Sequence, residues 1–391
     1  MIEHLYVHIP FCPRKCSYCA FVTHVGSLKL MEPYLRALAR EAESQAEEMP
    51  GGPLSTIYFG GGTPSMMSPE QLSRLLATFE SVWSLTPKPE ITIEAHPSTV
   101  DADKLGRYMQ SGANRLSFGA ESMQSGELKS LGRQHGEDRV REVVEIARWA
   151  GFSSINLDLM YGIPTQTRAS WRDSLHRVVK LRPDHLSLYP LSIEPKTIFA
   201  RAWRQNALHI PDDDQVSSMY DDACALLTAA GYIHYEVANW ALPGHLCRHN
   251  LAYWRNREYY GLGVGAHAYL RPYRIRNVEH TRPYIDRTLS RGMARCESVY
   301  LDADSQLNET AMLGLRLLQE GVNIRDIREK HGVDLLVRAG QEGRRLLDAG
   351  MLTQRGDRLL LSESAVPVAN EIWQTFLSTS PKVMSNTLST N

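Results

Sequence analysis

The sequence has few cysteines, almost no excess charge of either sign and no long hydrophobic run. Six cysteines in 391 residues are too few for a disulfide-stapled secreted scaffold. Forty-three Lys and Arg residues nearly balance 44 Asp and Glu residues, so the net charge of −1 excludes a globally basic nucleic-acid binder. Because no run of about 18 apolar residues occurs, the sequence predicts no transmembrane helix.

The N-terminus also lacks the features of a targeting segment. The run MIEHLYVHIPF has no cationic stretch followed by an apolar core, so it predicts no secretory signal peptide. We therefore expect a cytoplasmic protein with reduced thiols. The composition, with 43% apolar and 22% charged residues, is that of an ordinary globular protein, and the length predicts two or three domains.

Six short apolar runs in the first half of the chain are typical of β-strands. They are LYVHIP (5–10), TIYFG (56–60), ITIEA (91–95), RLSFGA (115–120), INLDLMY (155–161) and HLSLYP (185–190). Segments with helical periodicity separate them, and Ser68 before Pro69 is a typical helix N-cap. Alternating strands and helices predict an α/β fold around a parallel sheet. We expect an incomplete (β/α)6 TIM-like barrel with its chemistry at the C-terminal ends of the strands.

The composition changes after the sixth run, which predicts further domains. Residues 245–295 hold ten arginines against three acids, with seven Tyr or Trp residues. Helical patterns follow at 310–318, 324–330 and 335–349, and then a hairpin-like stretch around Gly356. The predicted segments are a core barrel at 1–235, a basic, aromatic-rich extension at 236–303, a winged-helix-like α+β domain at 304–378 and a flexible tail at 379–391.

Three of the six cysteines, Cys12, Cys16 and Cys19, lie within eight positions after the first predicted strand. Three thiolates at this spacing can bind three iron atoms of a cubic [4Fe–4S] cluster and leave the fourth iron without a protein ligand. An open coordination position is what a catalytic metal site requires. Two alternatives stay open on spacing alone: a structural zinc site with His8 or His24 as fourth ligand, or three unrelated loop cysteines.

The CxxxCxxC pattern, with HIPF before it and Tyr18 before its last cysteine, resembles the radical S-adenosylmethionine (SAM) superfamily. The run YVHIPFC is similar to the HemN-like branch, which contains oxygen-independent coproporphyrinogen III dehydrogenases and heme chaperones of the HemW type. Further motifs recur in the order of that branch. They are FGGGTPS (59–65), IEAHPS (93–98), LGRQH (131–135), NLDLMYGIP (156–164), RHNLAYW (248–254), GLGVGAHAY (261–269) and MLGLRL (312–317). The resemblance covers residues 4–376 and implies a radical SAM barrel with a HemN-type C-terminal domain.

The resemblance implies that the open iron binds SAM, whose reductive cleavage yields methionine and a 5′-deoxyadenosyl radical. The residues implied to hold SAM are Tyr6, Gly61, Gly62, Thr63, Glu94, Glu121, Arg133 and Asp158. A guanidinium such as Arg133 can bind the SAM carboxylate through two hydrogen bonds, and a carboxylate such as Glu94 can accept from a ribose hydroxyl. Asp158 lies inside an apolar strand, so a ligand or an internal salt bridge must satisfy it. Taken singly, each of these residues also fits a turn, a surface charge or a core position.

Four positions depart from the family pattern. Glu121 stands where the family usually has Gln, and an anion in place of an amide can accept a hydrogen bond but cannot donate one. Ala20 and His96 stand where Asp and Asn are common, and Thr165 replaces a frequent Gly. These changes bear on SAM affinity and cleavage rate rather than on the fold.

Two functions are compatible with the resemblance: a heme chaperone that binds heme and passes it on, and a coproporphyrinogen III dehydrogenase or another HemN-like radical SAM enzyme. The dehydrogenases carry a fourth cysteine two positions after the third, but Ala20 and Phe21 follow Cys19 here. They also have a long extension before the cluster, whereas eleven residues precede Cys12. The run RHNLAYW matches the HNxxYW motif of HemW-type chaperones. These features favour the chaperone.

The motif points to heme contacts at His249, Asn250, Tyr253 and Trp254. The imidazole of His249 can ligate heme iron, although a capping or core histidine is an equal alternative, and the basic segment can pair with propionates. We expect a [4Fe–4S] cluster and SAM as cofactors, with heme as cargo. The expected partners are acceptor hemoproteins and an electron donor, with peripheral membrane contact through acceptors. We expect no nucleic-acid partner.

Overall fold

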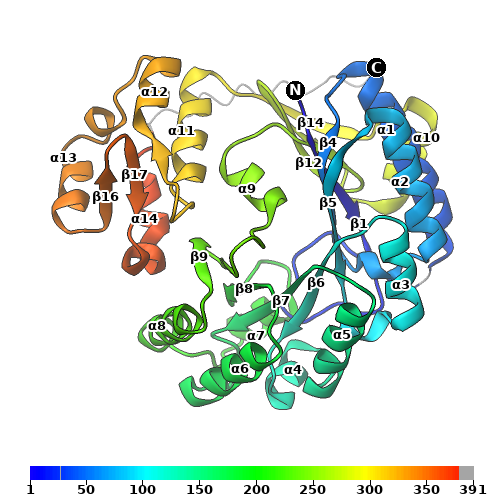
Figure 1. Cartoon of the computed structure of the whole chain (residues 1–391), viewed down its shortest axis with the longest axis horizontal. Coiled ribbons are helices and arrows are strands. Elements are labelled where there is room, and N and C mark those ends of the chain that lie inside the picture. Colours follow the sequence, from blue (N-terminus) through cyan, green and yellow to red (C-terminus); the bar gives the residue numbers. More distant parts are fainter. Residues whose placement is uncertain (27, 378–391) are drawn as a thin grey trace.

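The computed structural model describes residues 1–26 and 28–377 (Figure 1). The tail predicted at 379–391 therefore lies outside the described residues. Within the described part, no helix combines the length and the apolar character that crossing a membrane requires.

The body of the molecule is an open sheet, in which the described residues form nine strands in the order β11-β1-β4-β5-β6-β7-β8-β10-β9. The six central strands run parallel and confirm the predicted α/β class. They are β1 (His4–Ile9), β4 (Leu54–Gly61), β5 (Leu85–Ala95), β6 (Arg115–Glu121), β7 (Ser154–Tyr161) and β8 (His185–Pro190). Each contains its predicted run or lies within one residue of it, except that β5 begins six residues earlier than expected.

Helices between the strands cover the outer face of the sheet (Figure 1). The longer ones are α1 (Met31–Glu48), α2 (Pro69–Trp83), α3 (Ala102–Gln110), α5 (Glu137–Trp149), α6 (Arg168–Lys180) and α8 (Asp213–Ala229), and the shorter ones are α4 (Ser125–Leu131) and α7 (Ile198–Arg204). The predicted start of α2 is confirmed, because the Ser68 side chain accepts from the Gln71 backbone N–H and the Gln71 side chain accepts from the Ser68 N–H. Short elements in the connecting loops are β2 (Phe11–Cys12), β3 (His24–Val25), η1 (Leu28–Leu30), η2 (Pro64–Met66) and η3 (Pro97–Thr99).

The two faces of the parallel strands differ in polarity, because successive side chains of a strand point to opposite sides. Apolar residues such as Leu5, Ile57 and Leu157 are fully buried in the main core. Polar residues such as Glu94 and Asp158 alternate with apolar ones along their strands and line a cavity on the inner face. The fold thus places its chemistry inside the curve of the sheet.

Segments after residue 230 extend both edges of the sheet. The hairpin β9 (Ile233–Glu236) and β10 (Asn239–Ala241) pairs antiparallel to β8, and β11 (Tyr260–Leu262) pairs parallel to β1. Helix α9 (Arg248–Trp254) connects the two edges. The Glu90 carboxylate accepts from the Arg248 and His249 backbone N–H groups, so it caps the N-terminus of α9. Part of the predicted basic extension therefore belongs to the main sheet.

A second, three-stranded sheet follows β11. It consists of β12 (His267–Leu270), β13 (Tyr273–Asn277) and β14 (Arg295–Tyr300), with α10 (Thr281–Arg291) packed against α1. Glu41 of α1 joins these elements, because its buried carboxylate accepts from the Gly263 N–H, the Asn277 side-chain amide and the Tyr284 hydroxyl at 2.6 to 2.8 Å. Burial raises the pKa of Glu41 to about 7.

The C-terminal part has its own hydrophobic core and lies beside α8 and α9 (Figure 1). Its elements are α11 (Ala303–Gly314), β15 (Val322–Asn323), α12 (Ile324–His331), α13 (Leu335–Asp348), β16 (Leu352–Arg355), β17 (Arg358–Leu361), η4 (Glu363–Val368) and α14 (Ala369–Gln374). Helices followed by a β-hairpin confirm the winged-helix-like prediction. The helix predicted at 310–318 begins earlier, at Ala303, because the Asp302 side chain caps it by accepting from the Ser305 N–H.

Candidate functional site

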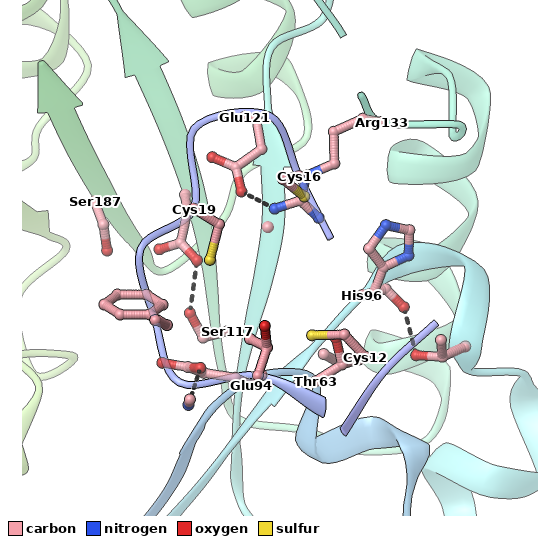
Figure 2. A pocket seen from close by; sticks show the side chains of 18 of the residues that line it. Cys12, Cys16, Cys19, Thr63, Glu94, His96, Ser117, Glu121, Arg133 and Ser187 are labelled. Carbon is pink, nitrogen blue, oxygen red and sulfur yellow. Dashed lines mark hydrogen bonds and ion pairs between the residues drawn. The ribbon is translucent and has the colours of Figure 1, made fainter. Parts of the chain in front are cut away.

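A cavity of about 770 Å³ occupies the inner face of the sheet. The cysteine loop, the glycine turn after β4 and the C-terminal ends of β5 to β8 line one end of the cavity, the upper end. Cys247, just before α9, and Asn250, on α9, line the other end, near the N-terminal ends of the strands. Figure 2 shows the three cysteine side chains around the same space as Glu94 and Glu121. The residues predicted to form the cluster and SAM sites are thus close together.

The loop that carries Cys12, Cys16 and Cys19 is held at both sides by backbone hydrogen bonds. The Ser17 N–H donates to the Leu131 carbonyl, and the Phe199 N–H donates to the Ser17 carbonyl, both at 3.1 Å. All three thiols are half-buried, and burial raises the pKa of each. A metal centre that stabilises thiolates would offset this cost.

The arrangement of the sulfurs fits a cluster better than a single zinc ion. Sulfurs around one tetrahedral zinc lie about 3.8 Å apart, given Zn–S bonds of about 2.3 Å. Among the described residues only Cys224, His234 and Glu363 bring three ligand atoms within 4.8 Å of one another, so at least two of the loop sulfurs lie farther apart than that. Both ring nitrogens of His8, a predicted alternative zinc ligand, are occupied by the Tyr6 hydroxyl and the Val22 carbonyl.

The glycine turn after β4 requires glycine for packing within the protein. Gly61 has a φ of 110°, and a Cβ there would lie 2.4 Å from the His8 ring. A Cβ on Gly62 would lie 2.6 Å from the Pro10 carbonyl. This close approach of β1 to the turn places Thr63 at the cavity, where its hydroxyl lies 3.4 Å from the Cys12 sulfur.

Two carboxyl groups face the cavity from β5 and β7, the strands on either side of β6. Glu94 accepts from the Tyr58 hydroxyl at 2.9 Å and from the Gly61 N–H at 3.1 Å, and burial together with the charge of Asp158 raises its pKa to about 7. Asp158 accepts from the Asn156 amide at 2.7 Å and from the Ser117 hydroxyl at 3.2 Å. Burial and the charge of Glu121 raise its pKa to about 6. Neutral donors, rather than the salt bridge considered from the sequence, satisfy Asp158.

Arg133 and Glu121 form an ion pair at the upper end of the cavity, as Figure 2 shows. Arg133 also donates to the Tyr18 hydroxyl at 3.1 Å. Its Nε is buried without a hydrogen-bond partner within the described chain. An unpartnered guanidinium nitrogen beside the cavity is suited to an incoming carboxylate. Glu121 has a φ of 63° and presents its carboxylate to Arg133.

Tyr6 lies beneath the cavity rather than at its surface. Its ring stacks on Tyr58 with ring centres 6.3 Å apart, and its hydroxyl bonds to His8 Nδ1 at 3.1 Å. The lining instead includes several residues that sequence reasoning missed. They are Tyr18, Tyr58, Arg115, Ser117, Asn156, His185 and Ser187. Tyr18 lies in the cysteine loop, whereas the other six lie on β4, β6, β7 and β8, where their alternation with apolar residues was the signal that could have found them.

The residues predicted to contact heme lie on α9. Among them Asn250 lines the cavity, whereas His249 is only 1% exposed. Both ring nitrogens of His249 form hydrogen bonds, Nδ1 with the Thr56 hydroxyl at 2.8 Å and Nε2 with the Tyr253 hydroxyl at 3.0 Å. Burial lowers the pKa of His249 to about 3, so the ring is neutral. Iron ligation by His249 stays a prediction, and it requires one of these bonds to break.

The fourth predicted heme contact, Trp254, packs against the C-terminal part. Its ring lies 4.9 Å from the guanidinium carbon of Arg316, which also stacks on Trp373 at 4.0 Å. Much of the basic segment is likewise engaged within the protein. Arg255, Arg274, Arg276 and Arg295 each form an ion pair with an acid outside residues 245–295, and Arg276 also pairs with Glu279 inside them. The local excess of arginine is therefore partly neutralised in the fold.

Comparisons with known proteins agree with this geometry. Residues 6–178 match the radical SAM superfamily, and residues 301–368 match the HemN C-terminal domain. The chain is 34% identical over 379 residues to the heme chaperone HemW of Bacillus subtilis, covering 96% of this chain and 99% of the relative. It is 40% identical over 266 residues to HemW of Escherichia coli, covering 67% of this chain and 69% of the relative.

A solved structure shows the same fold. Coproporphyrinogen III oxidase (HemN) from Escherichia coli, described as a radical SAM enzyme, superimposes with a TM-score of 0.84 over 97% of this chain and 91% of that chain. Its sequence identity is 24%, so this likeness concerns the fold. The chain matches a HemW protein at 34% identity along nearly its whole length and carries the cysteine loop and the glycine turn. It therefore belongs to the HemW family of the radical SAM superfamily.

Proposed function

We propose that the protein is a heme chaperone, which binds heme and passes it to acceptor hemoproteins. The observation that carries the proposal is the match to HemW proteins along nearly the whole chain, including both the barrel and the C-terminal part. The dehydrogenase-like structure, at 24% identity, supports the fold only. Where the dehydrogenases carry a fourth cysteine, this chain has Phe21, whose side chain is 68% exposed at the cavity.

Membership of the radical SAM superfamily implies a [4Fe–4S] cluster and SAM, and the residues present fit both. We assign the cluster to Cys12, Cys16 and Cys19, which line one cavity and of which at least two sulfurs lie more than 4.8 Å apart. When bound, the cluster and SAM supply one-electron chemistry. The protein must therefore also meet an electron donor.

The SAM site is assigned to the upper half of the cavity. Arg133, with its unpartnered Nε, would bind the SAM carboxylate. Glu94 and Asp158 offer acceptors for ribose hydroxyls from the inner face of the sheet. The turn at Gly61 and Gly62 presents backbone atoms beside them. Tyr6 packs behind the cavity lining by stacking on Tyr58, and the Glu121 carboxylate neutralises the positive charge of Arg133.

Heme contact is assigned to α9, at the other end of the strands. Asn250 reaches the cavity there, and His249 and Tyr253 lie directly behind it. We propose that His249 ligates heme iron after its Nε2 exchanges the Tyr253 hydroxyl for the metal. Trp254 at the end of α9 contacts Arg316, so heme binding at this helix would also affect the C-terminal part.

Heme titration and transfer of the anaerobically reconstituted protein test the proposal. We expect one heme per chain and its delivery to an apo-hemoprotein. The variant His249→Ala should lose tight binding, whereas the matched variant Tyr253→Phe, which frees Nε2, should retain or strengthen it. Equal affinity of His249→Ala and the wild type would remove the ligand assignment. A wild type that takes up no heme would contradict the chaperone function.

A second candidate is a HemN-like radical SAM enzyme, such as a coproporphyrinogen III dehydrogenase. The cavity favours it, because beyond the SAM residues its lining continues to the polar residues Arg115 and His185. Buried Arg115 is suited to a substrate carboxylate. Decarboxylation of coproporphyrinogen III by the same reconstituted sample, without heme uptake, would establish the enzyme in place of the chaperone.

A further inference from the structure

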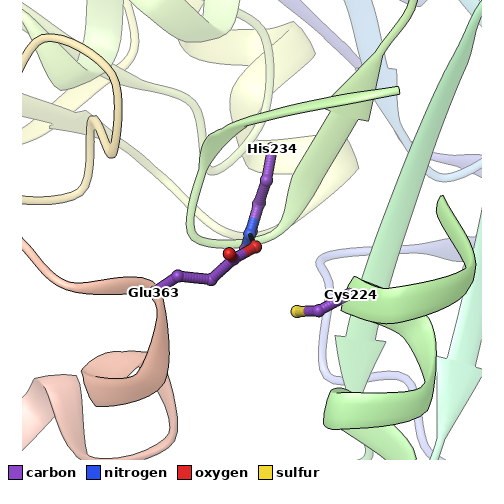
Figure 3. A group of neighbouring side chains, drawn as sticks. All are labelled: Cys224, His234 and Glu363. Atoms are coloured by element: carbon purple, nitrogen blue, oxygen red, sulfur yellow. Dashed lines mark hydrogen bonds and ion pairs between the residues drawn. The ribbon is translucent and has the colours of Figure 1, made fainter. Parts of the chain in front are cut away.

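A second cluster of metal-binding side chains lies outside the radical SAM cavity, where the barrel meets the C-terminal part. Cys224 belongs to α8, His234 to β9 and Glu363 to the start of η4 (Figure 3). Among the described residues this is the only group of three whose ligand atoms all lie within 4.8 Å of one another. Two consecutive elements of the barrel part and a third, 129 positions after His234, thus bring a thiol, an imidazole and a carboxylate together.

The imidazole of His234 is held in a fixed orientation. Its ring stacks on Trp240 with ring centres 3.8 Å apart and an angle of 12° between the planes. Nδ1 lies 2.7 Å from Oε1 of Glu363, and the other ring nitrogen is buried without a hydrogen-bond partner in the described part of the chain. A buried, oriented imidazole that faces a carboxylate is the arrangement of two metal ligands. Without a metal, a shared proton joins His234 Nδ1 and the Glu363 carboxylate.

The distances are compatible with one tetrahedral ion after a small movement. Ligand atoms around zinc lie about 3.3 to 3.7 Å apart, given bonds of about 2.0 to 2.3 Å. The side chain of Glu363 is 49% exposed, so its carboxylate can move back from His234 to admit the ion. A cavity of about 420 Å³ reaches both His234 and Glu363, so ions and water have access from that side.

The donor set selects among metals by its chemistry. A thiolate and an imidazole are ligands of zinc and cobalt, and they are poor ligands of magnesium or calcium, which prefer oxygen. Burial raises the pKa of the Cys224 thiol to about 12, so without a metal this sulfur stays protonated. Three protein ligands leave a fourth position for water or a small ligand.

We propose that Cys224, His234 and Glu363 bind one zinc ion at the joint between the barrel and the C-terminal part. The ion cross-links α8, β9 and η4. Direct contacts already join the two parts here, because the Gln319 amide donates to the His234 carbonyl and the Tyr220 hydroxyl donates to the Glu363 carbonyl. Zinc therefore fixes an interface that is already formed. The proposal is independent of the heme function.

Zinc X-ray absorption on the full-length, cluster-loaded protein tests the site. With the cysteine loop occupied by iron and sulfide, we expect about one zinc per chain, with one sulfur at about 2.3 Å and nitrogen or oxygen ligands at about 2.0 Å. A zinc shell of three or four sulfurs would place the metal in the cysteine loop and overturn the proposal, as would the absence of zinc after incubation with zinc salt and desalting.

Matched cysteine variants supply the second measurement. Cys224→Ser should lower zinc content at least tenfold, whereas Cys296→Ser, which changes an exposed cysteine elsewhere, should leave it unchanged. Zinc should also raise the thermal unfolding temperature of the wild type and of Cys296→Ser but not of Cys224→Ser. Full zinc retention by a folded Cys224→Ser variant would overturn the proposal. Should that variant fail to fold, Glu363→Gln, at a half-exposed position, replaces it with the same expected loss.

Discussion

At the scale of single residues, the inner face of the sheet concentrates charge in a confined space. Glu94 and Asp158 have raised pKa values because both are buried and each feels another carboxylate nearby. Arg133 supplies one positive charge, and Glu121 already pairs with it. The balance of charge at this site therefore depends on a position where the family usually has an amide.

The variant Glu121→Gln tests that balance. Removing the anion leaves Arg133 without a charged partner and lowers the repulsion on the SAM carboxylate. We expect SAM to bind about three- to tenfold more tightly, equivalent to about 0.7 to 1.4 kcal/mol. Calorimetric titration of SAM into the cluster-loaded protein measures this. Glu320→Gln, which breaks the remote ion pair with Arg255, is the control and should bind SAM like the wild type. Weaker binding by Glu121→Gln would show that the carboxylate itself contacts SAM.

The pKa of Asp158 predicts a pH effect on stability. The folded protein holds this proton up to about pH 6, whereas an exposed Asp releases it near pH 3.8. Proton binding therefore favours the folded state at low pH, and this contribution is lost as the pH rises through 6. Between pH 5 and 7.5 the wild type should lose about 1 kcal/mol relative to Asp158→Asn. Urea unfolding of both proteins without ligand measures the difference, and parallel pH profiles would contradict the prediction.

At the scale of elements, α9 closes the end of the barrel opposite the cysteine loop. Glu90 caps its N-terminus, and His249 links it to β4 through Thr56. This packing was not predictable from the sequence, because RHNLAYW is a polar run whose burial depends on partners nearly 200 positions earlier. The motif was visible from the sequence, but its place beneath the strands was not.

We predict that His249 stabilises this contact whether or not it also ligates heme. His249→Ala leaves a buried gap and removes the bonding partner of Tyr253. The free energy of unfolding should fall by about 2 to 4 kcal/mol, and by about 1 kcal/mol for Tyr253→Phe, which loses one hydrogen bond. Both are measured by urea unfolding in the absence of heme. A loss below about 0.5 kcal/mol for His249→Ala would mean that α9 does not depend on this side chain.

The predicted strands and helices show what local pattern can determine. The six parallel strands were predictable because each is a short, β-branched or aromatic run flanked by turn residues. The start of α2 was predictable because Ser68 before Pro69 is a typical N-cap. The starts of β5 and α11 were not, because Pro87 and Pro89 obscure the first part of that strand and the cap at Asp302 precedes the apolar pattern. The pairing of β11 with β1 depends on contacts about 250 residues apart.

At the scale of the whole molecule, ion pairs between residues far apart in the sequence neutralise part of the positive charge of residues 245–295. The arginines of residues 245–295 suggested one basic surface, yet Arg274 pairs with Glu309 and Arg295 with Glu48. These ion pairs join the segment to α11 and α1. Net charge along a sequence window therefore overestimates the positive charge that is available to an anionic ligand.

Arg316 illustrates how the C-terminal part is attached to the barrel. Its guanidinium lies between Trp254 of α9 and Trp373 of α14. Arg316→Ala loses both cation–π contacts and the packing of the side chain, so we expect a loss of about 1 to 3 kcal/mol and faster proteolysis around α14. Arg344→Ala, on the exposed face of α13, is the control and should change neither. Unfolding curves and limited proteolysis measure the two effects.

We propose that three thiolates hold an iron–sulfur cluster with one iron open to SAM. Electron paramagnetic resonance of the anaerobically reconstituted and reduced protein tests this most directly. We expect the signal of a [4Fe–4S] cluster, a clear change in that signal when SAM is added, and no signal when Cys12, Cys16 and Cys19 are all replaced by alanine. A wild type that yields no cluster signal, or whose signal SAM leaves unchanged, would contradict the account.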